Sequence, residues 1–159
     1  MKLALRQSQG GMALFVSLIF LLLLTIIGVA SMQSATLQEK MAGNVKLKIE
    51  SFQRAEKGLR EGESFIATLK NETALGTCAD CEGSACRVPD FSAPSPGVGV
   101  CNAWKYSNAS ASYYYIQKLG TSSAVMNLPE GTHATLYRVT AVASAGGSRT
   151  ALESIYAHH

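Results

Sequence analysis

An uncharged apolar stretch lies near the start of the chain and is followed by an amphipathic one. Residues 12–30 read MALFVSLIFLLLLTIIGVA and contain no charged side chain. As a helix they would extend about 28 Å, at about 1.5 Å per residue, close to the ~30 Å hydrocarbon core of a bilayer. Uncharged but more polar residues continue to Gln38. The pattern predicts one membrane-spanning helix over residues 12–38.

A cleaved secretory signal and a buried core helix are the alternatives for this stretch. Secretory signals usually have an apolar region of only about 7–15 residues. This region is longer, although Gly28 and Ala30 would allow a cut after Ala30. A core helix needs protein on all sides, and the rest of the chain is too small to supply it. A membrane anchor is therefore the preferred interpretation.

Residues 39–70 combine many charges with apolar residues at helical spacing. Opposite charges four residues apart support a solvated face. Absence of proline before Pro89 indicates that this segment and the apolar one form a single helix. Gly58 and Gly62 predict close approach of another backbone. Steps of three or four residues define one stripe: Met41, Val45, Ile49, Phe52, Ala55, Leu59, Gly62, Ile66 and Leu69.

Residues 71–112 lose this periodicity and are rich in Gly, Ser, Ala, Pro and Cys. A loop this long needs a restraint, and thiols outside the cytoplasm are normally oxidised. We expect two disulfides, in any of three pairings, among Cys78, Cys81, Cys86 and Cys101. Zinc is an alternative, but the spacings fit no common zinc motif. A redox CxxC is another, but it lacks the strand and helix context of such motifs.

Residues 113–159 contain three runs typical of strands, at 113–119, 135–143 and 149–157. Gly146-Gly147 between the last two indicates a hairpin, and the flanking residues suggest a loop longer than two residues. An antiparallel sheet with one apolar face needs a cover, and only the amphipathic helix is long enough. The sequence thus predicts an α+β fold, in which the second half of a long N-terminal helix packs on a small antiparallel sheet, with the disulfide-restrained loop between them.

The distribution of charge excludes one class of partner and sets the topology. The formal net charge is +3, but Lys2 and Arg6 precede the apolar stretch, and without them 12 basic residues remain against 11 acidic ones. No electrostatic footprint for nucleic acid remains. By the positive-inside rule, residues 1–11 lie in the cytoplasm and the C-terminal domain lies across the membrane.

The sequence does not indicate enzyme chemistry. Gly62-Glu63-Ser64 lacks the second glycine of a nucleophile elbow. Asp80, Glu82 and Asp90 lie near the cysteines but lack the spacing of a calcium loop. We therefore expect no catalytic residue, cofactor or metal. A signal-anchored periplasmic enzyme or binding protein remains an alternative, but it would need a pocket of convergent polar groups.

The overall layout resembles that of the type IV pilins: a basic leader ending in glycine, an uncharged helix, an amphipathic continuation and a small helix-plus-sheet domain. More narrowly, residues 9–44, QGGMALFVSLIFLLLLTIIGVASMQSATLQEKMAGN, and the following FQRAEKGLREGE are similar to minor pilins of the PilX type, in which EKMAGN-like and FQxAE-like stretches recur. The resemblance implies a pilin-like fold and a non-enzymatic structural subunit. A type II secretion pseudopilin shares the architecture and is the closest alternative.

The resemblance implies how the N-terminus is processed. In that family a prepilin peptidase cuts after the leader glycine and methylates the new amino terminus. The matching residues here are Gly11, which ends leader 1–11, and Met12, with a cut after Gly10 as the alternative. Most pilins carry a glutamate at the fifth residue of the processed chain, and this chain has Val16. That departure favours a minor subunit near the pilus tip over a major one.

The resemblance also implies location and partners. The subunit would be stored in the inner membrane as a single-pass protein with a periplasmic domain. Inner-membrane assembly machinery would then add it to the extracellular pilus with other minor pilins and the major pilin. Because aromatic residues anchor interfaces when exposed, Trp104, Tyr106 and Tyr113 are the candidate partner surface. The alternative is that they fill space between loop and sheet.

Overall fold

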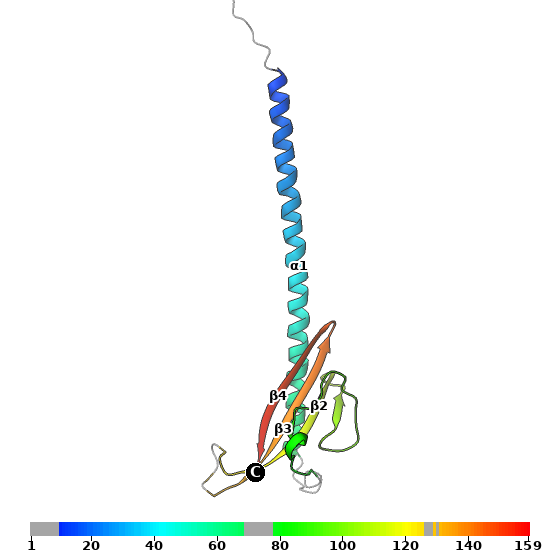
Figure 1. The fold of residues 1–159 in the computed structure, drawn as a ribbon, viewed down its shortest axis with the longest axis vertical. Coiled ribbons are helices and arrows are strands. Elements are labelled where there is room, and N and C mark those ends of the chain that lie inside the picture. Colours follow the sequence, from blue (N-terminus) through cyan, green and yellow to red (C-terminus); the bar gives the residue numbers. More distant parts are fainter. Residues whose placement is uncertain (1–9, 69–77, 126–128, 130) are drawn as a thin grey trace, which may run out of the picture. The chain divides into compact units, whose positions relative to one another are not determined.

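The computed structural model of the chain describes residues 10–68, 78–125, 129 and 131–159. The predicted leader residues 1–9, Leu69 of the stripe and the first part of the loop lie outside the described residues. The chain divides into two compact units, Met1–Gly43 and Asn44–His159. The fold is α+β, as predicted (Figure 1). Its elements are α1 (Gly10–Thr68), η1 (Gly83–Cys86), β1 (Trp104–Ser107), β2 (Ser112–Ser122), β3 (Ala134–Ala145) and β4 (Ser148–His158).

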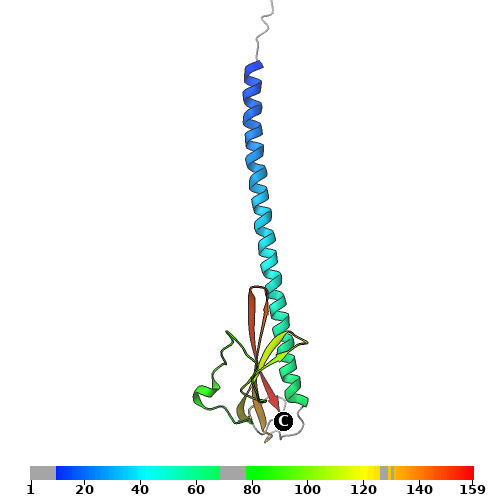
Figure 2. The ribbon, with the colours of Figure 1, turned by 90° about the vertical axis from the view of Figure 1, so that its right-hand side faces the viewer.

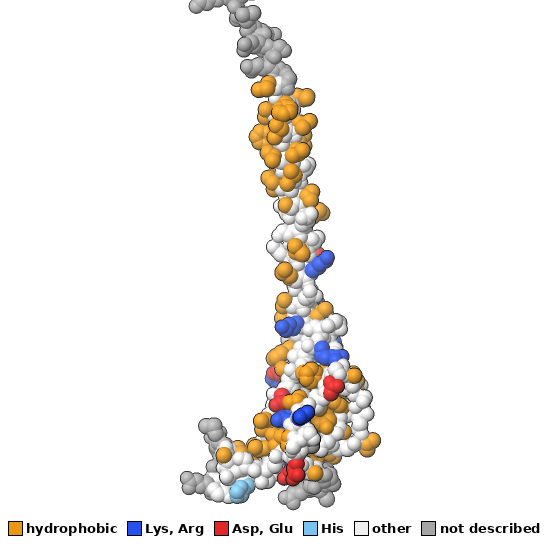
Figure 3. Space-filling model, in the orientation of Figure 1, with side chains coloured by type: hydrophobic (Ala, Val, Ile, Leu, Met, Phe, Trp, Pro, Cys, Tyr) orange, Lys and Arg blue, Asp and Glu red, His pale blue; other side chains and the backbone are white. Residues whose placement is uncertain are grey.

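The described part of the first unit is the apolar half of α1. This helix is long and apolar enough to cross a membrane, and Figure 3 shows hydrophobic side chains covering its first half before the first charged ones. Hydroxyls donated to helix carbonyls need no outside partner, which suits an apolar environment. Such bonds run from Ser17 to Leu14, Thr25 to Leu22 and Thr36 to Gln33.

The second unit contains an antiparallel sheet in the order β1-β2-β3-β4. A long pairing at one edge of the sheet joins β3 to β4 from Thr135↔His158 to Ala145↔Ser148. The three predicted strand runs are confirmed, and each observed strand is longer than its run. Strand β1 was not expected, because it lies inside the predicted loop. Its four residues, WKYS, are too few to show alternation.

The β3–β4 hairpin corrects one prediction. Ala145 pairs with Ser148, so only Gly146 and Gly147 form the connection, and the expected longer loop is wrong. Gly146 has φ +56°, a conformation that costs glycine little and suits the tight turns of two-residue hairpins. A Cβ at Gly146 would also lie 3.0 Å from Leu47 Cδ1 of α1. Both the backbone conformation of the turn and its contact with Leu47 therefore favour glycine at position 146.

The sheet lies along the last part of α1 (Figure 2), and small residues of α1 face it. Ser51 and Ala55 have no exposed surface. A Cβ on Gly58 would collide with the Ser112 hydroxyl, and one on Gly62 would lie 2.5 Å from Val139 Cγ1. Both glycines thus lie in close contact with the strands, but the nearest atoms belong to strand side chains and not to the backbone that the sequence predicted. Strand side chains therefore fill the space that larger helix residues would occupy.

The predicted stripe is only half correct as the cover of the sheet. Ala55, Gly62 and Ile66 are buried, but Val45, Ile49 and Phe52 are exposed by 56%, 52% and 47%. The β3–β4 hairpin instead meets Ser51, whose hydroxyl lies 2.7 Å from Thr150 Oγ1. Helix periodicity located an apolar arc, but the neighbouring residues that fit the hairpin determine the packed face.

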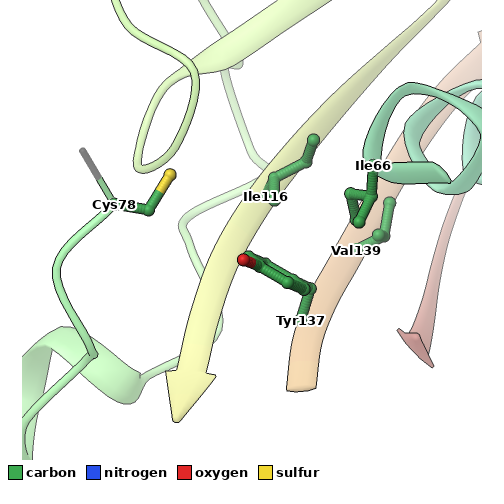
Figure 4. Packing of buried hydrophobic residues seen from close by; sticks show 5 residues of the cluster. All are labelled: Ile66, Cys78, Ile116, Tyr137 and Val139. Atoms are coloured by element: carbon green, nitrogen blue, oxygen red, sulfur yellow. The ribbon is translucent and has the colours of Figure 1, made fainter. Parts of the chain in front are cut away.

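The hydrophobic core lies at the far end of this interface (Figure 4). Ile66 of α1 and Val139 of β3 are fully buried, and Ile116 of β2 is 1% exposed. Tyr137 completes the strand contribution, and Cys78 joins from the loop. Burying a large aliphatic side chain contributes about 1.5–3 kcal/mol, so this cluster anchors the end of α1 on the sheet.

All four cysteines form disulfides, as predicted. Cys78 bonds to Cys101 and Cys81 to Cys86. Hydrogen bonds then hold the loop on the sheet face opposite α1. The Arg138 guanidinium donates to Cys86 O at 2.6 Å and the Gln117 amide donates to Arg87 O at 3.0 Å. The loop therefore has both covalent and polar restraints.

Candidate assembly surfaces

The predicted processing positions lie at the start of α1. Gly10 and Gly11 belong to its first turn. Met12 is 73% exposed and Val16 is 46% exposed. Both side chains belong to an apolar surface that extends along the helix, and Val16 contributes neither charge nor hydrogen-bonding group to it. Cleavage after Gly11 and methylation of Met12 stay predictions.

The second half of α1 carries an exposed apolar stripe, which we define as Val45, Ile49 and Phe52. These side chains are four and three residues apart, so they share one face of the helix. Each is about half exposed. On the same half-helix, Arg54 pairs with Glu50 and Arg60 with Glu56, each at 2.5 Å. The stripe is thus an apolar surface beside a charged one, and it is available to another protein.

The three aromatic candidates do not lie in equivalent surroundings. Trp104 is only 8% exposed, and its ring packs edge-on against Tyr115 with centroids 5.2 Å apart. Tyr106 is 46% exposed and packs on Tyr113 at 4.9 Å. Trp104 thus fills space within the domain, as the alternative interpretation held. Tyr106 and Tyr113 remain together at an accessible site.

Two arginines that the sequence analysis did not single out lie beside Tyr106 and Tyr113. Arg54 of α1 and Arg149 of β4 line the same cleft as the tyrosines. The Arg54 guanidinium donates to Ser144 O at 3.1 Å, and Arg149 Nε donates to the Ser144 hydroxyl at 3.4 Å. No local motif joins residues this far apart in the chain, so only the three-dimensional structure brings them together.

Burial changes the ionisation of tyrosines in the sheet. Loss of hydration raises the pKa of Tyr114, and the nearby Glu61 carboxylate raises it further. Burial also raises the pKa of Tyr115 and Tyr137. These phenols are neutral at physiological pH and belong to the packing of the domain. Among the described residues, no three His, Cys, Asp or Glu side chains gather as metal ligands would.

Comparison with known proteins identifies the N-terminal segment. Residues 10–60 match the family model of the PilX N-terminal domain. The match covers the apolar half of α1 and the exposed stripe, and it ends just before Gly62. No curated protein and no solved structure matches the chain.

Proposed function

We propose that the chain is a type IV pilus-related pilin, because residues 10–60 match the N-terminal domain of PilX-type pilins, and that it is a minor pilin of a tip or priming complex. The observation that carries this proposal is the family match, which coincides with an exposed apolar helix. Pilins of this family are structural components, and an N-terminal apolar helix followed by a C-terminal domain fits membrane anchoring.

The argument for a tip position rests on Val16. An acidic side chain inside the bilayer costs about 2.5 kcal/mol or more at mid-helix, and less near the edge. A pilin that carries glutamate at this position recovers that cost by pairing with the amino terminus of a neighbour. Because Val16 is uncharged, it avoids the cost of burying a charge in the bilayer but cannot form the ion pair with a neighbouring amino terminus. Met12 can still offer its amino terminus to the glutamate of another subunit, so this subunit gains charge pairing from one side only.

The proposed life cycle begins in the inner membrane. The prepilin peptidase removes residues 1–11 and methylates Met12, and the domain stays in the periplasm until assembly. Inner-membrane machinery then places the subunit with other minor pilins, and the major pilin follows. Support for this order comes from the family match and from the uncharged first half of α1.

Intact mass of the mature protein tests the maturation step. We expect a chain that starts at Met12 and carries one added methyl group. A chain that starts at Ser31 would show secretory cleavage, and an uncut chain would show a simple anchor. Either result would overturn the pilin assignment. A Gly11→Leu variant should accumulate uncut and serves as the control for peptidase action.

Pilus counts and immunogold labelling test the position in the filament. Deletion of the gene should reduce the number of pili more than their length, because priming precedes elongation. Val16→Glu should be tolerated without raising the abundance of the subunit in sheared pili. Even labelling along the shaft would contradict the tip position while leaving the pilin assignment intact.

A further inference from the structure

A cleft of about 500 Å³ lies in the second unit, where the loop, the sheet and α1 meet. This volume falls within the about 300–1,000 Å³ that is common for ligand sites. Residues from α1, the loop and all four strands line it, among them Arg54, Ser92, Tyr106, Tyr113, Val142 and Arg149. The cleft thus combines two guanidinium groups with two phenol rings.

The two arginines are held in place by one strand residue but differ in their pairing. Ser144 accepts from Arg54 through its carbonyl and from Arg149 through its hydroxyl. Arg54 is also paired with the Glu50 carboxylate. Arg149 also donates to the carbonyl oxygens of Phe91 and Ser92. In the described part of the chain, no carboxylate lies within ion-pair distance of Arg149.

Because the described partners of the Arg149 guanidinium are neutral, its positive charge is available to bind an anion. Its five N–H groups match a carboxylate in a bidentate arrangement, which is stronger than bonds to neutral acceptors. The bonds to the loop carbonyls fix the Arg149 side chain, so less conformational entropy is lost on binding. The loop carboxylate of Asp90 accepts the Ser92 N–H at 2.8 Å, and it is not part of the lining.

The Tyr106 ring supplies an apolar surface next to that charge, whereas Val142, which also lines the cleft, is almost fully buried. Val142 is 2% exposed and Tyr106 is 46% exposed. The Tyr106 ring packs on Tyr113, which holds the exposed ring in place. Tyrosine and arginine are enriched among the residues that dominate protein interfaces. The cleft therefore suits a side chain with a negative tip and an apolar neighbour.

We propose that this cleft binds an acidic side chain on an exposed segment of a partner pilin, with Arg149 as the anchor and Tyr106 as the wall. The charge complementarity between Arg149 and a carboxylate identifies the chemistry of the occupant. The identity of the partner as a pilin rests on the proposed function. The Tyr106–Tyr113 pair packs on the residues that flank the acidic one.

Peptide binding to the purified full-length protein in detergent micelles tests the proposal directly. The probes are the fluorescein-labelled peptide Gly-Ser-Ala-Phe-Glu-Ala-Ser-Gly and its counterpart with Gln in place of Glu, followed by anisotropy. We expect the Glu peptide to bind about tenfold more tightly, as one charge-assisted bond pair predicts. Added salt should reduce the preference.

Variants assign the preference to the cleft. Arg149→Gln should abolish it, Arg149→Lys should retain part of it, and Tyr106→Ala should weaken both peptides. Arg60→Gln removes a surface arginine that is paired with Glu56 and should change nothing. Equal binding of the two peptides, no binding of either, or a preference that survives Arg149→Gln would overturn the proposal. Because no pilus assembly is involved, the proposed function can fail without affecting this result.

Discussion

The second half of α1 has two faces that reverse the usual relation between hydrophobicity and burial. The buried face consists of small residues, Ser51, Ala55, Gly58 and Gly62, whereas the stripe Val45, Ile49 and Phe52 is exposed. Small residues allow the helix backbone to approach the strands, and the contact gains from close packing. The large apolar residues stay exposed on the surface of the domain. The comparison separates residues that fold this domain from residues available for assembly.

The largest expected effect comes from the disulfide at the buried end of this face. Cys78 packs in the cluster with Ile66 and bonds to Cys101, 23 residues away in sequence. Replacing both by alanine should lower the free energy of unfolding by about 3 kcal/mol. The Cys81–Cys86 disulfide closes a shorter loop, with a sequence separation of 5. The matched double variant Cys81→Ala/Cys86→Ala should therefore lower the free energy of unfolding by only about 2 kcal/mol. Urea denaturation measures both. Equal costs would indicate that the core cluster does not depend on Cys78.

Gly62 tests the buried face itself. A methyl group there meets Val139, a fully buried side chain that cannot move aside. Overpacking costs about 1–3 kcal/mol, and the better helix propensity of alanine returns up to about 1 kcal/mol. Gly62→Ala should therefore destabilise by about 1–2 kcal/mol in thermal or urea unfolding.

Gly43→Ala provides the control for Gly62, because no atom lies within 4 Å of a Cβ at Gly43. This change should leave stability equal or raise it by up to about 1 kcal/mol. If both variants behaved alike, the contrast between a packed and an open glycine in one helix would be lost.

Ser51 tests the polar part of the buried face. Its hydroxyl donates to Lys48 O at 2.9 Å and lies 2.7 Å from Thr150 Oγ1. Ser51→Ala removes a hydrogen bond of about 1 kcal/mol net, partly offset by helix propensity. We expect a loss of about 0.5–1 kcal/mol. Ser64→Ala on the exposed face should cost nothing, and a comparable loss there would indicate a general effect of serine removal.

Alkaline titration tests the same interface at Tyr114, whose ring lies 3.4 Å from a Cβ built at Gly62. Burial and the Glu61 carboxylate both raise the pKa of Tyr114. Stability from this group is complete below the unfolded pKa of about 10 and is lost as pH rises through the higher folded value. Tyr114→Phe should therefore reduce the loss of stability at high pH, measured by urea unfolding at increasing pH, while phenolate absorbance follows the ionisation of Tyr114 in the unmodified protein. Glu61→Gln should reduce it less, since burial is the larger cause.

The sequence predicted the elements better than their contacts. Periodicity gave the long helix and the three long strands, because 59 and 11–12 residues are enough to show a pattern. The expected location of the domain outside the cytoplasm predicted that the cysteines form disulfides, but it did not predict which cysteines pair. Strand β1 was missed because four residues show no alternation. The side of α1 that packs on the sheet was predicted only in part. It depends on shape complementarity with β3 and β4, which the sequence of the helix alone does not reveal.

The functional predictions also succeeded where the signal was local in the sequence and failed where it depended on contacts between distant residues. The apolar stretch and the residues after it carried the family resemblance, because they form a local pattern that the match over residues 10–60 repeats. The cleft was not foreseen, since Arg54 and Arg149 are far apart in the sequence and both bind Ser144 in the folded domain. Of the aromatic candidates, composition alone could not distinguish buried Trp104 from exposed Tyr106. Exposure is a property of the folded domain and not of residue type.

The smallest effect on stability should come from the exposed stripe, where Phe52 is the test residue. Phe52 is 47% exposed, and surface changes away from packed contacts usually alter stability by about 0.5 kcal/mol or less. Phe52→Ala should therefore unfold like the unmodified protein but yield fewer pili, because an apolar contact with a neighbouring subunit is lost. Lys57→Ala on the exposed face should leave both readouts unchanged. A loss near 2 kcal/mol for Phe52→Ala would contradict the assignment, since it would mean that this side chain stabilises its own domain rather than the contact with a neighbour.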